Sequence, residues 1–155
     1  LIMAHTDPSE GGYTPEQLAR FKAQNTALIP TLSLFTTVVL DPNVTKQLVA
    51  ATVNQLKQFS ENGGPVLFGT DVGFTKLYDT TQEFQLMHRA LSERQVLASL
   101  TTNPARFFKA ARKGKVEQGF DADLVVLDGD PLSDVANLAK VSTTIRAGHV
   151  IYQKP

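Results

Sequence analysis

The stretch that decides the fold runs from Pro65 to Gly73 and reads PVLFGTDVG. It follows a Gly63-Gly64 break, contains an apolar run too short for a helix, and delivers the carboxylate Asp71 as that run ends. This pattern predicts a buried strand that leads into a polar loop. In α/β enzymes, catalytic or metal-binding groups commonly lie where a parallel strand meets the loop that follows it. An aspartate there can equally cap the loop or the next helix through its side-chain oxygens.

On the N-terminal side of this stretch, strand and helix patterns alternate. Residues 1–4 are apolar and precede His5, and residues 27–32 form the next expected strand. One helix is expected from Thr14, where a capping box begins, and a second from Asp41 up to the glycine pair. The order strand, helix, strand, helix, strand predicts a parallel sheet covered by helices, and therefore an α/β fold.

Beyond the stretch the pattern is helical as far as about residue 113. A first helix is expected around Phe84, and a second begins at the capping box of Ser92. Asn103 is the expected cap of a third helix, which should end near Lys113.

From Gly114 onwards the pattern changes to β. Alternating apolar residues and glycine turns favour antiparallel pairing. The expected strands cover residues 115–117, 124–127, 141–145 and 150–152. We therefore predict a domain boundary near residue 114, between an α/β part (1–113) and a small β module (114–155).

Composition excludes several classes of partner. The chain has 155 residues, and its 15 Lys and Arg balance its 15 Asp and Glu, so nothing points to nucleic acid or an anionic membrane. No apolar stretch approaches the length of a membrane span, and cysteine is absent, so histidine and carboxylate are the strong metal ligands available. The chain begins with an apolar run whose first residue is Leu1 rather than Met, which leads us to expect a fragment; the cellular compartment stays unknown.

Ordered motifs give the chain a resemblance to a known family. Residues 114–128 read GKVEQGFDADLVVLD and residues 145–152 read IRAGHVIY. Residues 99–105 read SLTTNPA, and Gly69-Thr70-Asp71 lies within the stretch quoted first. In this order the motifs resemble the C-terminal region of metal-dependent amidohydrolases, with the imidazolonepropionase-like and Xaa-Pro dipeptidase-like branch as the closest in character.

The resemblance implies a fold and a site. The fold would be the C-terminal part of a TIM (β/α)8 barrel, about strands six to eight, followed by a small β-sandwich segment. His5 would match the metal-binding histidine that ends strand six. Asp71 would match the aspartate that ends strand eight, which binds metal and moves a proton from water to the leaving group. Zinc is the expected ion, one or two per complete enzyme, and the substrate would be a small molecule or peptide with an amide, peptide or cyclic amide bond.

The match is incomplete. The family's paired histidines on strand one, its bridging lysine or equivalent on strand four and its histidine on strand five have no counterpart in this sequence. A catalytic zinc normally has three protein ligands, and here only His5 and Asp71 match. We therefore expect the chain to be inactive without a complementing N-terminal segment.

Other candidate residues carry weaker predictions. Thr31, Ser33, Val72 and Phe74 follow strand ends, where they could contact substrate or be ordinary loop residues. His88 is expected to be a partly buried or surface histidine, and His149 to be exposed in a hairpin turn. The remaining carboxylates form an acidic series that lacks the glycine and terminal glutamate of a calcium loop and is better explained by turns that flank strands. These carboxylates are Asp121, Asp123, Asp128 and Asp130.

Two functional hypotheses remain open. In the first, the chain is the C-terminal part of a metal-dependent hydrolase of C–N bonds. In the second, it is a non-catalytic remnant or scaffold that persists by self-association. An incomplete barrel would expose strand edges and apolar interior, so both hypotheses predict a homo-oligomer or a complementing segment.

Overall fold

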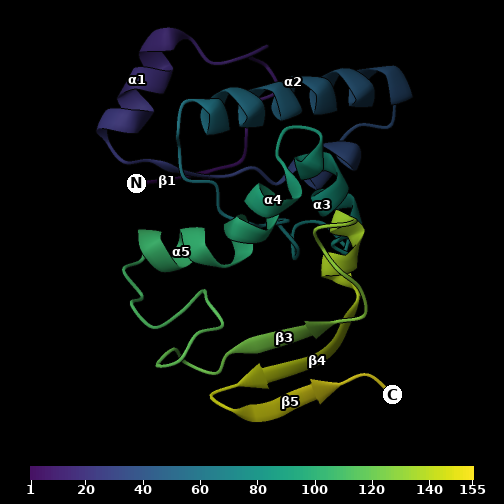
Figure 1. Ribbon diagram of the computed structural model, residues 1–155. Coiled ribbons are helices and arrows are strands. Elements are labelled where there is room, and N and C mark those ends of the chain that lie inside the picture. The colour runs from purple at the N-terminus through teal and green to yellow at the C-terminus, as the bar shows by residue number, and fades with distance from the viewer.

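The computed structural model describes residues 1–155 as an α/β body with a three-stranded sheet below it (Figure 1). The body contains a short parallel layer, helices that cover it and two 3-10 turns. None of the helices combines the length and the apolar composition that a membrane span requires. The helices are α1 (Pro15–Ala23), α2 (Pro42–Glu61), α3 (Thr81–His88), α4 (Glu93–Leu100) and α5 (Thr102–Phe107), and the 3-10 turns are η1 (Leu32–Thr36) and η2 (Val135–Ala139).

The parallel layer has the predicted order. Strand β1 (Ile2–Ala4) pairs in parallel with β2 (Ala27–Ile29), and on the other side of β2 a parallel bridge joins Leu28 to Val66. Around this bridge Leu28 N–H donates to Pro65 O at 3.0 Å, and Leu67 N–H donates to Leu28 O at 2.8 Å. The strand predicted after Pro65 is therefore reduced to one parallel bridge at Val66 and forms no regular strand. This bridged segment, residues 65–68, is called the third strand.

Helix starts follow the capping chemistry of the sequence in most cases. Capping boxes begin α1 at Thr14 and α4 at Ser92, and the Asp41 side chain caps α2. The prediction for α5 was wrong, because Thr101 is its N-cap and the helix ends at Phe107 rather than near residue 113. The Asn103 amide instead donates to Val66 O at 3.0 Å, a contact between distant segments.

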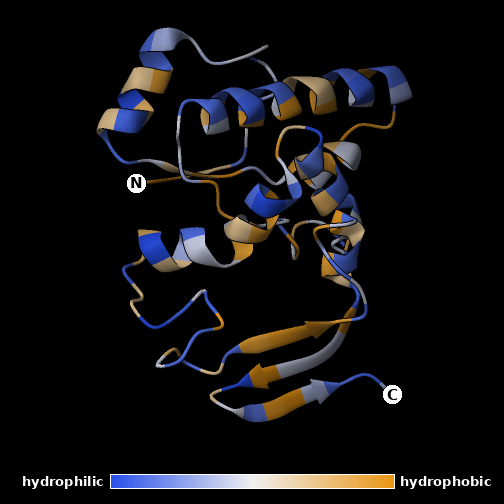
Figure 2. Ribbon diagram, in the orientation of Figure 1, coloured by the Kyte–Doolittle hydropathy of each residue, from blue (hydrophilic) through white to orange (hydrophobic).

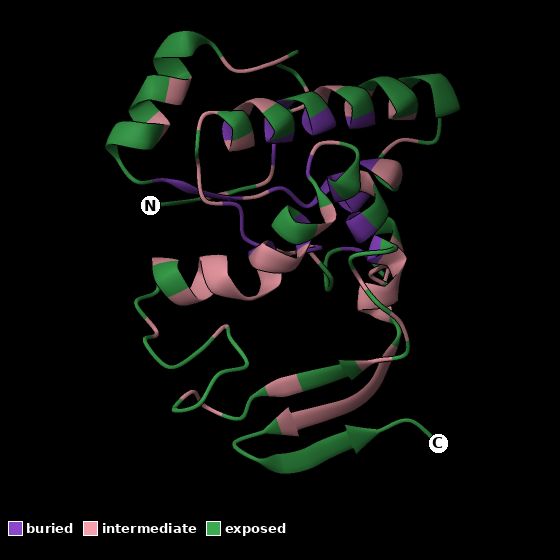
Figure 3. Cartoon of the chain, in the orientation of Figure 1, coloured by how far each residue is buried: buried purple, intermediate pink, exposed green.

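One hydrophobic core holds the layer and the helices together. The inner face of α2 contributes Phe59, which is 1% exposed, and α3 and α4 contribute Phe84 and Val96, which are equally buried (Figure 3). Leu28 of β2 lies in the same cluster. Phe59 also contacts the start of the third strand, because a Cβ at Gly64 would lie 2.3 Å from its Cε1 atom. The helix and the segment that leads to Asp71 are thus packed as one unit.

The C-terminal sheet is antiparallel, as predicted, in the order β3 (Leu124–Leu127), β4 (Val141–Arg146), β5 (His149–Gln153). Residues 115–117 form no strand, contrary to prediction. The sheet carries exposed apolar side chains, and all of β5 is exposed (Figures 2 and 3). Between β3 and β4, Val135 of η2 is buried in the main core. The boundary near residue 114 stays a prediction, and η2 is a contact across it.

Candidate metal and active site

The two expected metal ligands follow strands that point the same way. His5 comes directly after β1, and its N–H donates to Ile29 O at 2.9 Å, so pairing with β2 continues up to the histidine. Asp71 follows the third strand on the other side of β2. Because parallel strands point toward one edge of a layer, His5 and Asp71 lie toward the same edge, on either side of β2.

The backbone is strained at this edge. His5, Thr31 and Asp71 have φ values of 70°, 49° and 58°, all in the left-handed region that favours glycine. Thr31 is β-branched, which makes this conformation especially costly. Left-handed non-glycine residues therefore follow all three parallel strands, and strain of this kind gathers at functional sites.

A hydrogen-bond chain determines the tautomer of His5. The His5 Nδ1 atom lies 2.7 Å from Thr31 Oγ1, and Thr31 Oγ1 lies 2.8 Å from Pro30 O. A carbonyl oxygen can only accept, so the single hydroxyl proton of Thr31 is donated to Pro30. Thr31 Oγ1 must then accept from His5 Nδ1–H. The neutral imidazole therefore presents the lone pair of Nε2, the form in which histidine acts as a ligand or base.

Asp71 is half-buried at the start of a tight turn. Its carbonyl oxygen accepts from the N–H groups of Phe74 and Thr75, each at 3.2 Å. Two residues earlier, a Cβ at Gly69 would lie 2.5 Å from Cγ2 of Ile29, so glycine is needed for the third strand to approach β2 this closely. These constraints fix the position of Asp71 relative to β2.

The donor set fits part of a zinc site. An imidazole nitrogen and a carboxylate are both ligands that zinc accepts. Nowhere in the chain do three or more His, Cys, Asp or Glu side chains come together as a metal-binding group. A catalytic zinc takes three protein ligands, and the donor set of His5 and Asp71 matches two of them.

The four candidate substrate contacts fall into two pairs. Thr31 and Ser33 are buried, at 3% and 4% exposure. Val72 and Phe74 are exposed, and Phe74 lines an open cavity of about 610 Å³. The other lining residues are Thr37, Val38, Thr75, Lys76 and Leu77. Contact of any of these four residues with substrate stays a prediction, and the exposed pair is the one that a ligand can reach.

Two buried polar residues near the site were missed from the sequence. The Gln55 side chain of α2 accepts from Asp7 N–H at 2.9 Å and donates to Asp7 O and Glu10 O at 2.6 and 2.8 Å, which fastens the loop after His5. Glu83 of α3 is fully buried, and its carboxylate accepts from Leu32 N–H and Ser33 N–H at 2.9 and 2.7 Å. Helical spacing marks both positions as inward-facing, but neither partner can be found from local sequence.

The buried carboxylate of Glu83 makes stability depend on pH. Burial raises its pKa above the ordinary value of 4.5, and its hydrogen bonds to Ser33 and Leu32 offset this only in part. The folded state thus holds the proton more tightly than the unfolded state. The stabilising contribution is complete below pH 4.5 and is lost as the pH rises through the raised pKa.

We therefore expect the free energy of unfolding of the native chain to fall, relative to that of Glu83→Gln, as pH increases above 4.5. Urea denaturation of both proteins across this range measures the difference. Parallel stability curves would show that burial does not perturb this carboxyl group.

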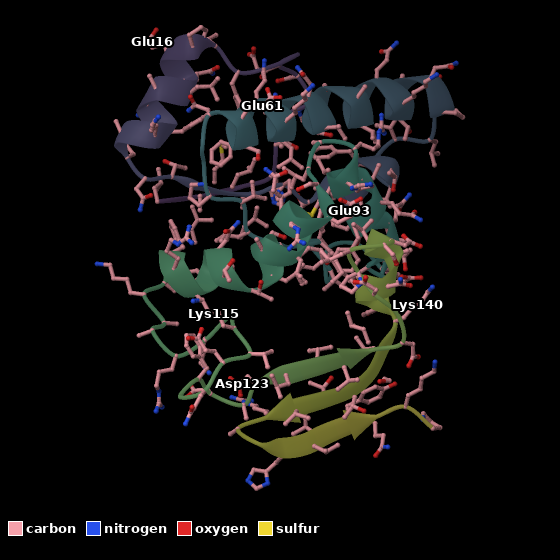
Figure 4. The ribbon with its side chains drawn as sticks, viewed as in Figure 1. Glu16, Glu61, Glu93, Lys115, Asp123 and Lys140 are labelled. Atoms are coloured by element: carbon pink, nitrogen blue, oxygen red, sulfur yellow. The ribbon has the colours of Figure 1, made fainter.

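The remaining titratable candidates other than His149 have structural partners. His88 is partly exposed, with Nδ1 at 3.1 Å from Leu91 O and Nε2 at 3.6 Å from Glu93, and His149 is exposed at the start of β5. In the acidic series Asp123 pairs with Lys113 and accepts from Ala147 N–H, at the turn before β3 (Figure 4). Asp121 pairs with Arg112 and Lys113, and Asp128 pairs with Lys154. The carboxylate of Asp130 accepts from Leu132 N–H.

The site belongs to a class of α/β protein in which polar residues at the carboxyl ends of parallel strands form the functional edge. Residues 8–151 match the amidohydrolase family, and the chain belongs to that family. The predicted superfamily and its imidazolonepropionase-like and Xaa-Pro dipeptidase-like branch are thereby confirmed, since relatives of both kinds are found.

One similar sequence is an imidazolonepropionase of Thermoplasma acidophilum, 30% identical over 105 residues, which are 63% of this chain and 26% of the relative. A Xaa-Pro dipeptidase structure with bound methionine in its active site has a TM-score of 0.79 at 21% identity, over 99% of this chain and 40% of that one. A putative prolidase from Bifidobacterium longum has a TM-score of 0.79 at 26% identity, over 98% and 42%. The chain thus spans well under half the length of these relatives.

Proposed function

We propose that this chain is the C-terminal part of a TIM-barrel amidohydrolase, carrying about strands six to eight and a segment of a small β-sandwich, and that the complete enzyme cleaves C–N bonds with metal-activated water. The observation that carries the proposal is the edge itself: His5 and Asp71 follow parallel strands on either side of β2, both held in the left-handed conformation. Family membership and the coverage of the solved relatives support it.

The roles of the two ligands follow from their chemistry. A bound divalent ion, expected to be zinc, would polarise the scissile carbonyl and lower the pKa of water. His5 would hold the ion through Nε2, because Nδ1–H is engaged by Thr31. Asp71 would bind through its carboxylate and act as the general base that takes a proton from the attacking water and gives it to the leaving nitrogen. The remaining ligands would come from a preceding segment or a second chain.

We propose that the substrate is a small molecule or peptide with an amide, peptide or cyclic amide bond. Prolidase and imidazolonepropionase names among the relatives support this class. Val72 and Phe74 are the proposed side-chain contacts with substrate because both are exposed beside Asp71. Thr31 and Ser33 are buried. In the proposal the Thr31 hydroxyl orients His5, and Ser33 acts through its backbone N–H, which donates to Glu83.

Metal analysis tests this proposal. We expect stoichiometric zinc when the chain is prepared together with a segment that supplies the missing ligands, and a loss of affinity of at least about tenfold in His5→Gln or Asp71→Asn. Asp41→Asn, which keeps a good helix cap away from the edge, is the matched control and should bind zinc normally.

A second candidate function is a non-catalytic scaffold that assembles with copies of itself. It is favoured by the exposed apolar side chains of the outer strand β5, including Val150 and Ile151 at 59% and 61% exposure. This candidate predicts no zinc uptake in any preparation, so the same metal analysis separates the two.

A further inference from the structure

Glu83 is a buried carboxylate whose partners are backbone groups rather than a cation. It lies on α3, its side chain is fully buried, and its two oxygens accept from successive N–H groups, those of Leu32 and Ser33. Taking a carboxylate out of water is costly unless its hydrogen bonds are well made. A residue of this kind, reaching across 50 positions to a turn beside the candidate site, calls for a specific role.

The turn that Glu83 holds is η1, which begins directly after Thr31. A threonine before a helical turn normally caps it, its own hydroxyl accepting from one of the first free N–H groups. Thr31 makes no such bond here, because its backbone is left-handed and the N–H groups of Leu32 and Ser33 already donate to Glu83. The Thr31 hydroxyl is therefore left to accept from His5 Nδ1–H and to donate to Pro30 O.

We propose that Glu83 is a positioning residue for His5: its carboxylate holds the turn after β2 so that Thr31 engages Nδ1 and leaves Nε2 for a ligand. The inference rests on the proposed function in taking His5 as the residue that meets the metal. The proposal links α3 to the site through η1 and Thr31. Glu83 itself is neither a proposed metal ligand nor a proposed substrate contact.

The tautomer of His5 is the observable that tests this role. The chain has three histidines, so long-range ¹H–¹⁵N correlation spectra of the 155-residue chain can be assigned with single His→Gln variants. Native His5 should show the spectrum of one neutral tautomer, with the proton on Nδ1. Glu83→Gln keeps the side-chain volume but offers one acceptor oxygen for two N–H groups. We expect it to replace the single pattern by a mixture of both tautomers.

Matched variants separate positioning from general packing. Thr31→Val should give the same mixture with Glu83 intact, and Thr31→Ser should restore the single tautomer. Glu93→Gln makes the same chemical change at the start of α4 (Figure 4). Because Glu93 pairs with His88, this variant should alter the His88 signals while leaving His5 unchanged.

A folded Glu83→Gln protein with an unchanged His5 spectrum would overturn the proposal. Should that variant fail to fold, Glu83→Asp, which keeps the charge but falls short of the two N–H groups, is examined in the same way. Loss of folding in both would also overturn it, because Glu83 would then serve the core rather than His5. The experiment uses no metal and no substrate, so its result does not depend on whether the protein takes up zinc.

Discussion

Asp71→Asn is expected to lower kcat of the proposed hydrolase, assembled with its complementing segment, about a thousandfold, while the protein stays folded. The amide that replaces the carboxylate cannot accept a proton from water, and general-base catalysis contributes factors of this size. Asp71 is half-buried at a turn fixed through its backbone carbonyl, which the substitution leaves in place. Steady-state kinetics with Xaa-Pro dipeptides and cyclic amides, on the chain combined with its complementing segment, measure the effect.

The control for this variant is Asp41→Asn, the same chemical change at the cap of α2, which should leave kcat within about twofold. A kcat for Asp71→Asn within tenfold of the native value would contradict the assignment of Asp71 as the base. A fall in kcat shared equally by both variants would point to a general loss of folding instead.

Phe59→Ala should reduce the free energy of unfolding by about 3 to 5 kcal/mol, the usual result of removing a buried aromatic ring. Phe59 is 1% exposed, lies 6.0 Å from the ring of Phe21, and is in tight contact with Gly64 at the start of the third strand. The cavity would therefore loosen the segment that carries Asp71. Urea denaturation followed by circular dichroism measures the loss.

Phe108→Ala offers the matched control, because Phe108 is 62% exposed and its removal should change stability by no more than about 0.5 kcal/mol. A loss below 1 kcal/mol for Phe59→Ala would mean that α2 does not pack on the third strand as described.

Local patterns predicted most of the architecture. Thr14 and Ser92 begin helices where their capping boxes indicate, and apolar runs placed β1 and the antiparallel strands correctly. The strand predicted over 27–32 ends at Ile29, because Leu32 begins η1. The errors concern residues whose environment is set at long range. Asn103 lies in a good position for a cap, but its amide bonds to Val66 O instead, and residues 115–117 have a strand-like pattern without a strand partner.

His5 and Asp71 could be proposed as ligands because the motifs of the sequence resemble those of the amidohydrolase family, and their binding of a metal stays a prediction. The residues that support His5 could not be found in this way. The partnership of Thr31 with His5 spans 26 residues, and that of Glu83 with Ser33 spans 50. No helical or strand period connects such pairs, since they arise from parallel pairing and from the packing of α3 on η1. Thr31 also has a left-handed backbone, a conformation that a β-branched residue disfavours and that the sequence therefore does not predict.

The central claim is that His5 and Asp71 share one metal ion. Titration with Co²⁺ of the chain combined with a segment that supplies the missing ligands, followed by NMR, tests it directly, because a paramagnetic ion broadens the signals of the residues around it. We expect the His5 and Asp71 signals to broaden together at the same Co²⁺ concentration, and His5→Gln to weaken the broadening at Asp71. Broadening of the signals of only one of the two residues would contradict the account. So would broadening at Asp71 that His5→Gln leaves unchanged.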